Sequence, residues 1–322
     1  MKFKHSINVF IDNFSVTYKQ LLYRLIITVI AFVLYALIIT PYIKAVTGSP
    51  DYIHLVEGVK EFLQSLVRGN PEQIGLATDK IESAAAALLE MIAKKRANIA
   101  WGIVGIIAVH AVEKFFSGLG NYAAAAVIND KMALRANSPF LLTLVRNLKE
   151  ASLYNLMYVP LSLVYDGACY IGIYFFVFKL LALLPFVNIL AQLFLAVTAV
   201  VVVIAVKMTF TSDWLPSLIR GKAGQKKAFV NTFNRKNKKT FNVLSNFLVL
   251  VLIVFAVNMI SVVFTFGSAA LLTIPSSYII FICFEFVNYY DREELKYFID
   301  KNTIIKPEKE HTVTREQFFR GE

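Results

Sequence analysis

The sequence predicts an all-α membrane protein: a six-span transmembrane helical bundle with amphipathic cytoplasmic interfacial helices and a helical-hairpin extracytoplasmic insert. Three observations support this fold class. Hydrophobic residues make up 57 % of the 322 residues and charged residues only 17 %, whereas soluble domains carry about 25 % charge. Six apolar runs reach the length of about 20 residues that a helix needs to cross the hydrocarbon core. Basic residues gather between these runs and give a net charge of +11.

The six apolar runs are the predicted spans. Only a few residues separate the third span from the fourth and the fifth from the sixth, so each of these pairs is predicted to form a tight helical hairpin. The first span is too long for the apolar core of a cleavable signal peptide, and about twenty residues precede it. We place the spans at residues 21–43, 98–128, 152–178, 184–210, 242–266 and 268–290.

Lys and Arg counts set the predicted orientation, because cytoplasmic loops of membrane proteins carry an excess of these residues. With the N-terminus in the cytoplasm, 24 Lys and Arg lie on the cytoplasmic side and 8 on the opposite side. The 24 include Lys207 and the basic residues of the C-terminal tail, 291–322, whereas Lys114 lies inside the second span. This bias predicts a multi-pass protein of the cell membrane with both termini in the cytoplasm.

An amphipathic segment precedes each pair of spans, at residues 1–20, 129–151 and 211–241. The second and third segments share a Thr-x-x-Arg-x-x-Lys pattern, which begins at Thr143 and again at Thr232, 89 residues later. Spacings of three place these groups along one face of a helix. Two interpretations are open. The segments are interfacial helices that turn their basic residues toward lipid headgroups, or they mark a duplicated unit in a pseudo-symmetric bundle.

The third amphipathic segment is strongly basic. Because this run adjoins two spans, we do not expect nucleic acid as its partner. Contact with anionic lipid headgroups explains it, at about 1 kcal/mol for each basic residue near the surface. The residues predicted to contact anionic lipid are Arg220, Lys222, Lys226, Lys227, Arg235, Lys236, Lys238 and Lys239.

The insert at residues 44–97 is the predicted extracytoplasmic segment. Apolar residues recur at helical spacing on both sides of a Gly69-Asn70-Pro71 turn, which predicts two amphipathic helices that cover each other as an antiparallel hairpin. The hairpin is either a cap over the bundle or a docking site for an extracytoplasmic protein partner.

Residues 214–244 read WLPSLIRGKAGQKKAFVNTFNRKNKKTFNVL. This basic amphipathic segment, followed by a long apolar hairpin and repeated, resembles polytopic membrane proteins of Gram-positive bacteria and the membrane domain of some glycerophosphodiester phosphodiesterases. The resemblance covers about residues 130–290 and rests on the pattern. It implies a membrane-embedded accessory module and carries over no catalytic residue.

Motifs of soluble enzymes are missing from the sequence. It contains no H-E-x-x-H, G-x-S-x-G, G-x-x-x-x-G-K-[ST] or C-x-x-C, so we do not expect an enzyme. Only four His are present, and no two have the spacing of metal ligands. We therefore expect neither a metal nor a cofactor.

Ionisable groups inside the spans are the informative exceptions, because burying a charge in hydrocarbon is costly. Asp166 and His110 lie in the middle of the third and second spans, and Glu113 shares the helix face of His110. Counted from the outer edge at 1.5 Å per residue, Asp166 and His110 are both about 18 Å deep. They are predicted to form a buried polar pair, which is either a structural clasp or a proton-coupled or ion-binding site.

Three functions remain open at this level. We favour a non-enzymatic membrane module that organises anionic lipids or a partner complex. The alternative is a small transporter or channel that uses Asp166, His110 and Glu113 as a midplane polar site. The third, an intramembrane lipid-modifying enzyme, has no signature in the sequence.

Overall fold

The computed structural model describes residues 2–68, 71–94, 96–180, 189–221, 223–233, 237–300 and 303–305. These residues are almost entirely helical, with one two-stranded antiparallel sheet. Six of the described helical stretches are long and apolar enough to cross a membrane. The chain is therefore a multi-pass integral membrane protein, which confirms the predicted all-α membrane class.

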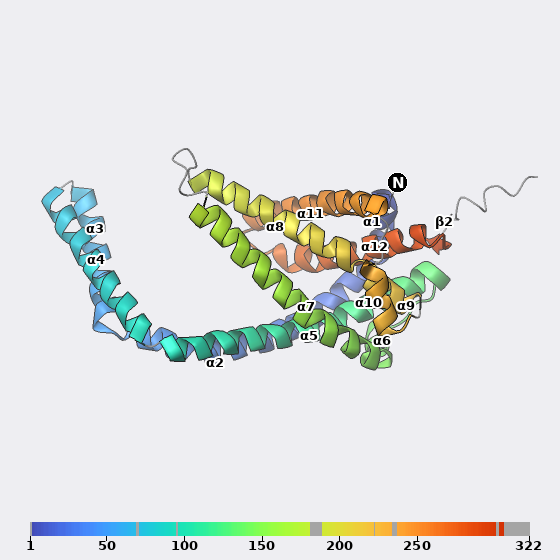
Figure 1. The fold of residues 1–322 in the computed structure, drawn as a ribbon, viewed down its shortest axis with the longest axis horizontal. Helices are drawn as coiled ribbons and strands as arrows, with labels where there is room; N and C mark the ends of the chain where they lie inside the picture. The colour runs from blue at the N-terminus through green and yellow to red at the C-terminus, as the bar shows by residue number, and fades with distance from the viewer. Residues whose placement is uncertain are drawn as a thin grey trace, which may run out of the picture. The chain divides into compact units, whose positions relative to one another are not determined.

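The elements follow one another with short connections (Figure 1). The first half of the chain forms α1 (Lys2–Asp12), α2 (Phe14–Thr47), α3 (Pro50–Arg68), α4 (Pro71–Lys94), α5 (Arg96–Leu134) and α6 (Phe140–Arg146). The second half forms α7 (Leu148–Ile173), the π-helical turn η1 (Tyr174–Leu180), α8 (Ile189–Thr211), α9 (Trp214–Ile219), α10 (Gln225–Phe233), α11 (Asn237–Thr265), α12 (Ala270–Arg292), β1 (Tyr297–Phe298) and β2 (Ile304–Ile305).

The helices of the first two predicted spans extend beyond the apolar runs at both ends, because flanking residues continue the same helices. The first predicted span, for example, is the middle of a 34-residue helix. Residues 184–188, the start of the predicted fourth span, lie outside the described residues. The six stretches are Phe14–Thr47, Ala100–Leu134, Leu148–Val177, Phe194–Ile219, Thr240–Phe264 and Ala270–Arg292.

The chain divides into two compact units. Unit 1 consists of Met1–Leu25 and Lys114–Glu322, and unit 2 of Ile26–Glu113. The boundaries fall inside α2 and α5, so each of these helices contributes to both units.

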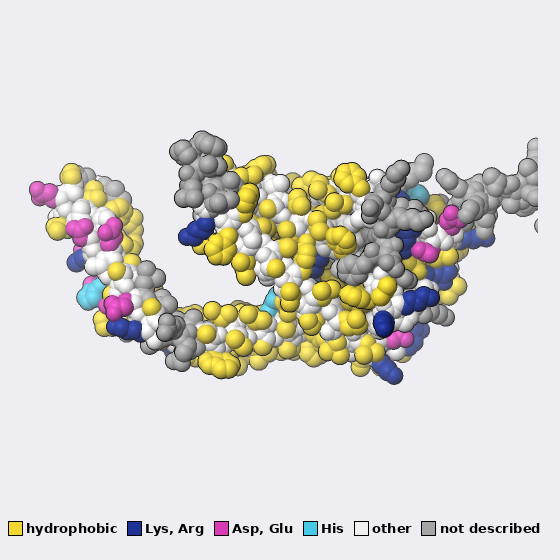
Figure 2. Space-filling model, viewed as in Figure 1, with side chains coloured by type: hydrophobic (Ala, Val, Ile, Leu, Met, Phe, Trp, Pro, Cys, Tyr) yellow, Lys and Arg dark blue, Asp and Glu magenta, His cyan; other side chains and the backbone are white. Residues whose placement is uncertain are grey.

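Unit 1 is a helical bundle. Within it α11 packs along α8 and α12, α7 packs against α8, and α1 lies on α12. One apolar core joins α8, α11 and α12 around Phe247 and Phe284, both fully buried and 5.1 Å apart between ring centroids. Outside this core the helices leave large apolar side chains exposed (Figure 2). That surface is what a bundle in lipid presents, since lipid tails are as apolar as leucine.

A second core in unit 1 is built around large aromatic side chains. It joins residues of α1, α5, α7, α9 and α12 around Trp214, Tyr290 and Tyr297, each about 1 % exposed or less. Trp214 lies between the Tyr154 and Phe229 rings, at centroid distances of 5.2 Å and 4.9 Å. The aromatic residues therefore anchor one end of the bundle, and α6, α9 and α10 lie at this end.

Small residues allow α5 to approach its neighbours closely in unit 1. A Cβ at Gly118 would collide with the side-chain oxygen of Asn155 on α7, and one at Gly120 would lie 2.6 Å from the Tyr23 ring on α2. Close approach of this kind through glycine is typical of helix packing in membranes.

The predicted amphipathic segment at 129–151 contains a break. Helix α5 ends at Leu134, Arg135 adopts a left-handed conformation with φ of 56°, and α6 begins after Pro139. The residue before a proline avoids the helical conformation. The segment therefore comprises the end of α5, the short helix α6 and the start of α7.

The N-terminal helix is fastened to the strand region of unit 1. The Tyr297 hydroxyl donates to an Asp291 carboxylate oxygen at 2.8 Å and lies 3.1 Å from the Nδ1 of His5 on α1. Burial, together with the negative charge of Asp291, raises the pKa of Tyr297. This contact joins the first helix of unit 1 to the segment that follows α12.

Unit 2 contains α2 from Ile26 onward, the pair α3 and α4, and α5 as far as Glu113. Helices α3 and α4 pack along each other, and Lys80 of α4 pairs with Glu61 of α3 at 2.9 Å. Between α2 and α5, a Cβ at Gly102 would lie 2.8 Å from the Tyr42 ring. Glycine thus brings these two helices together as it does in unit 1.

Candidate functional site

The membrane-spanning part of unit 1 contains a cluster of three charged side chains. The Asp166 carboxylate on α7 accepts hydrogen bonds from Lys207 of α8, at 2.8 Å to each oxygen, and from Lys114 of α5 at 2.8 Å. The Ser162 hydroxyl, one turn before Asp166, accepts from Lys207 at 2.6 Å. We call Lys114, Asp166 and Lys207 the charged triad.

The triad ties three membrane-spanning helices together. Its side chains are partly shielded, with 17 % of Asp166, 19 % of Lys207 and 28 % of Lys114 exposed. Shielding strengthens each ion pair, but it also makes an uncompensated charge expensive. Two ammonium groups against one carboxylate leave the triad with a formal charge of +1.

The predicted partners of Asp166 belong to the other unit of the chain. His110 and Glu113 form an i,i+3 pair within unit 2, with 3.7 Å between Nδ1 and Oε2, and the Tyr35 hydroxyl donates to Glu113 at 3.2 Å. The pairing of His110 with Asp166 joins residues of different units and stays a prediction. Sequence reasoning missed both lysines, although Lys114 lies only one turn after His110 on the same helix.

The structure describes only part of the basic run that is predicted to contact lipid. Lys226 and Lys227 on α10 are exposed. Arg220 is turned toward the Tyr290 ring, 5.5 Å from its centroid. Lys222, Arg235 and Lys236 lie outside the described residues, and so do the side chains of Lys238 and Lys239.

Helix α6 presents an apolar surface beside basic residues. Leu141, Leu142 and Val145 are 69 %, 62 % and 69 % exposed, whereas Phe140 and Thr143 face the protein interior and are buried. Arg146 is the last residue of α6 and lies 3.5 Å from a carboxylate oxygen of Asp130, and Lys149 follows in the first turn of α7. Both cations are exposed. Around α6 and α9, Figure 2 shows dark blue Lys and Arg side chains beside yellow hydrophobic ones. We call Leu141, Leu142, Val145, Arg146 and Lys149 the α6 surface.

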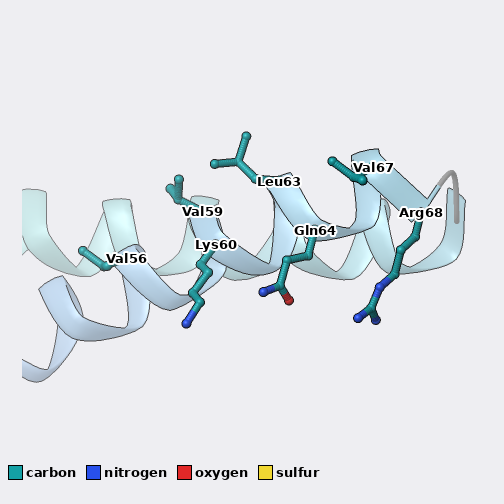
Figure 3. A pocket seen from close by; sticks show the side chains of 7 residues that line it. All are labelled: Val56, Val59, Lys60, Leu63, Gln64, Val67 and Arg68. Atoms are coloured by element: carbon teal, nitrogen blue, oxygen red, sulfur yellow. The ribbon is translucent and has the colours of Figure 1, made fainter.

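An open groove runs along α3 in unit 2 (Figure 3). Val56, Val59, Leu63 and Val67 form its apolar row, and Lys60, Gln64 and Arg68 form a polar row beside them. The four apolar side chains are exposed. Val56, Val59 and Leu63 belong to the periodic apolar pattern that predicted this helix. The side of α3 away from α4 is therefore amphipathic as well.

Comparisons with known protein families, with characterised proteins and with solved structures find no match for this chain. The resemblance to the membrane domain of glycerophosphodiester phosphodiesterases accordingly stays a prediction. The function is argued below from the geometry of the described residues.

Proposed function

We propose that this integral membrane protein is a non-enzymatic membrane module that gathers anionic lipids at the α6 surface. The observation that supports the proposal is the exposure of Leu141, Leu142 and Val145 beside Arg146 and Lys149. Helices with this arrangement lie in the membrane interface, with the apolar face among the acyl chains and the cations among the headgroups.

The position of α6 in the chain supports the same assignment. Only 13 residues separate the end of α5 from the start of α7, and both helices belong to membrane-spanning stretches. A helix in such a short connection has to lie close to the membrane surface. With the positive-inside orientation this surface is the cytoplasmic leaflet, where anionic lipids attract basic residues.

The charged triad fits a structural role in such a module. A carboxylate that accepts from two ammonium groups and fastens three helices keeps the bundle rigid beneath the α6 surface. The alternative function, a small transporter or channel, draws on the same triad, because its excess positive charge lies within membrane-spanning helices. A transporter would need the carboxylate of Asp166 to bind or release a proton or ion during each cycle.

The module also offers a surface for a protein partner at the α3 groove. Its apolar row matches one face of an amphipathic helix, and Lys60 and Arg68 along its edge favour a helix with acidic side chains there. We assign this groove to an acidic amphipathic helix of an extracytoplasmic partner.

Lipid selectivity tests the proposed function. In the test variant, Ser replaces the apolar residues Leu141, Leu142 and Val145, and Gln replaces the cations Arg146 and Lys149. Native mass spectrometry counts the phosphatidylglycerol and phosphatidylcholine molecules that stay bound. At about 1 kcal/mol per basic residue, loss of two cations lowers the preference for phosphatidylglycerol by about 30-fold. The matched control replaces the exposed Lys80 and Lys94 of α4 with Gln and keeps the preference. Unchanged selectivity in the α6 variant would refute the proposal.

A further inference from the structure

Helices α2 and α5 carry a small polar cluster in the membrane-spanning part of unit 2. The Tyr35 hydroxyl of α2 donates to the Oε2 atom of Glu113 on α5 at 3.2 Å, and the Nδ1 atom of His110 lies 3.7 Å from the same oxygen. All three residues belong to stretches that are long and apolar enough to cross a membrane. The cluster therefore places a carboxyl group and an imidazole one helical turn apart within membrane-spanning helices.

Glu113 differs from Asp166 because no ammonium or guanidinium group holds it. Among the described residues His110 is the one group that can pair with Glu113 as a cation. Lys114, the next residue along α5, donates to Asp166 instead. An ionised carboxylate without a partner is costly within a membrane. The Glu113 carboxyl group is therefore neutralised either by a proton of its own or by a proton on His110.

The facing helix, α2, adds a hydrogen bond to this pair and no charge. The titratable side chains of α2 within unit 2 are Tyr35, Tyr42 and Lys44. Tyr42 and Lys44 lie two turns or more beyond Tyr35 along the helix. In the part of unit 2 that the structure describes, Tyr35 is the one hydrogen-bond donor to the carboxylate, and a phenol is neutral at physiological pH. The charge of the cluster is therefore decided by Glu113 and His110.

A single proton is the ligand that fits this pair. A carboxylate beside a protonated imidazole and a carboxyl group beside a neutral imidazole are both neutral overall, so one proton balances the pair whichever atom carries it. A zinc ion takes more protein ligands than these two, and the described residues contain no group of three or more His, Cys, Asp and Glu that could hold a metal ion. The His110 and Glu113 side chains are 46 % and 25 % exposed, so the proton can exchange with the surroundings.

We propose that His110 and Glu113 form a proton-binding site in the membrane-spanning part of unit 2, with Tyr35 stabilising the ionised carboxylate. Carboxyl and imidazole groups within membrane-spanning helices serve as proton relays in pumps and transporters. The charged triad is unsuited to this role, because two ammonium groups already bind the Asp166 carboxylate. The proposed site shares no residue with the α6 surface, so it is independent of lipid binding there.

The test uses dicyclohexylcarbodiimide, an apolar reagent that reacts with protonated carboxyl groups, on the full chain in detergent between pH 5 and pH 9. Peptide mass spectrometry measures the adduct at each carboxyl group. We expect an adduct at Glu113 that decreases as the pH rises, and none at Asp166. Tyr35→Phe and His110→Gln each remove a group that stabilises the carboxylate, so the midpoint of labelling moves to higher pH by about one unit or more. Lys44→Gln on α2 is the control and leaves the midpoint unchanged.

Three results would overturn the proposal. The first is an adduct at Glu113 that is absent or constant from pH 5 to pH 9, since the carboxyl group then exchanges no proton. The second is an unchanged midpoint in His110→Gln, which would show that the imidazole takes no part. The third is protection of Glu113 by sodium chloride but not by choline chloride at constant pH, which would identify a metal cation as the ligand. Labelling of the parent protein alone decides the first and the third, so the test does not depend on the folding of a variant.

Discussion

The ammonium group of Lys207 lies 2.8 Å from both carboxylate oxygens of Asp166. Lys114 of α5 donates to one of the same oxygens at 2.8 Å. The two lysines therefore share one carboxylate. Removing one lysine leaves a neutral ion pair, whereas removing the carboxylate leaves two cations together in a partly shielded site.

The charged triad predicts that loss of its carboxylate destabilises the protein more than loss of one of its lysines. Asp166→Asn destabilises the bundle by about 3–5 kcal/mol, because it strands two charges. Lys114→Gln, which turns a formal charge of +1 into zero, has a much smaller effect. Thermal unfolding in detergent checks both variants. A Lys114→Gln variant less stable than Asp166→Asn would contradict the charge balance inferred for the triad.

The same variants separate the structural role of the triad from transport. If the triad is a clasp, Asp166→Asn with Lys207→Gln restores the formal charge of +1 and recovers part of the stability lost in Asp166→Asn. The transporter alternative would be favoured if the double variant is stably folded but does not recover the flux phenotype.

Close packing of α5 and α7 depends on Gly118. Gly118→Ala forces a Cβ into the side-chain oxygen of Asn155, and overpacking of this kind costs about 1–3 kcal/mol. Gly167→Ala is the matched control, since nothing lies within 4 Å of its Cβ position. We expect the melting temperature to fall for Gly118→Ala only. Equal melting temperatures for the two variants would mean that α5 and α7 do not approach at Gly118.

The contact between α1 and Tyr297 predicts a dependence on alkaline pH. Since the pKa of Tyr297 is raised in the folded protein, its contribution to stability is complete below the unfolded-state pKa of about 10 and is lost as the pH rises above that value. The stability advantage of the parent over Tyr297→Phe therefore shrinks above pH 10 and is smaller by about 1.4 kcal/mol at pH 11 than at pH 8. Denaturant titrations at pH 8 and pH 11 measure it. A constant difference would show that Tyr297 titrates normally.

The orientation prediction is tested by labelling cysteines in intact cells. Gly75 in α4 and Gly224 before α10 both have open space around them, so a cysteine fits at either position once Cys169 and Cys283 are replaced with Ser. The Lys and Arg bias predicts that an impermeant maleimide labels Gly75→Cys and spares Gly224→Cys. The reverse pattern would overturn the cytoplasmic placement of the termini and of α6.

Apolar runs predicted the membrane-spanning helices well, because twenty consecutive apolar residues have few alternatives to crossing a bilayer. The break between α5 and α6 was missed, although Asn137-Ser138-Pro139 carries a signal for it. Amphipathic spacing runs through residues 129–151 without interruption, and only the proline marks the break.

The partners of Asp166 illustrate a different limit. Counting residues from the edge of a span locates a Cα atom, and this method selected His110. A lysine side chain reaches several ångströms beyond its Cα, so Lys114, one turn further along, is as good a candidate. Lys207 was counted with the cytoplasmic charges, because it lies only three residues before the predicted end of the fourth span.

The depth of α6 is the most direct test of the central claim that this helix lies in the lipid interface. A spin label is attached at Leu142→Cys in a protein that also carries Cys169→Ser and Cys283→Ser, and the labelled protein is reconstituted in phosphatidylglycerol vesicles. The label reports its relative accessibility to oxygen and to a water-soluble nickel complex. The α6 surface predicts an oxygen-rich position about 5–10 Å below the headgroups, whereas a label at Lys80→Cys on α4 reports water. A label at Leu142 that is as accessible to nickel as the one at Lys80 would contradict the proposed function.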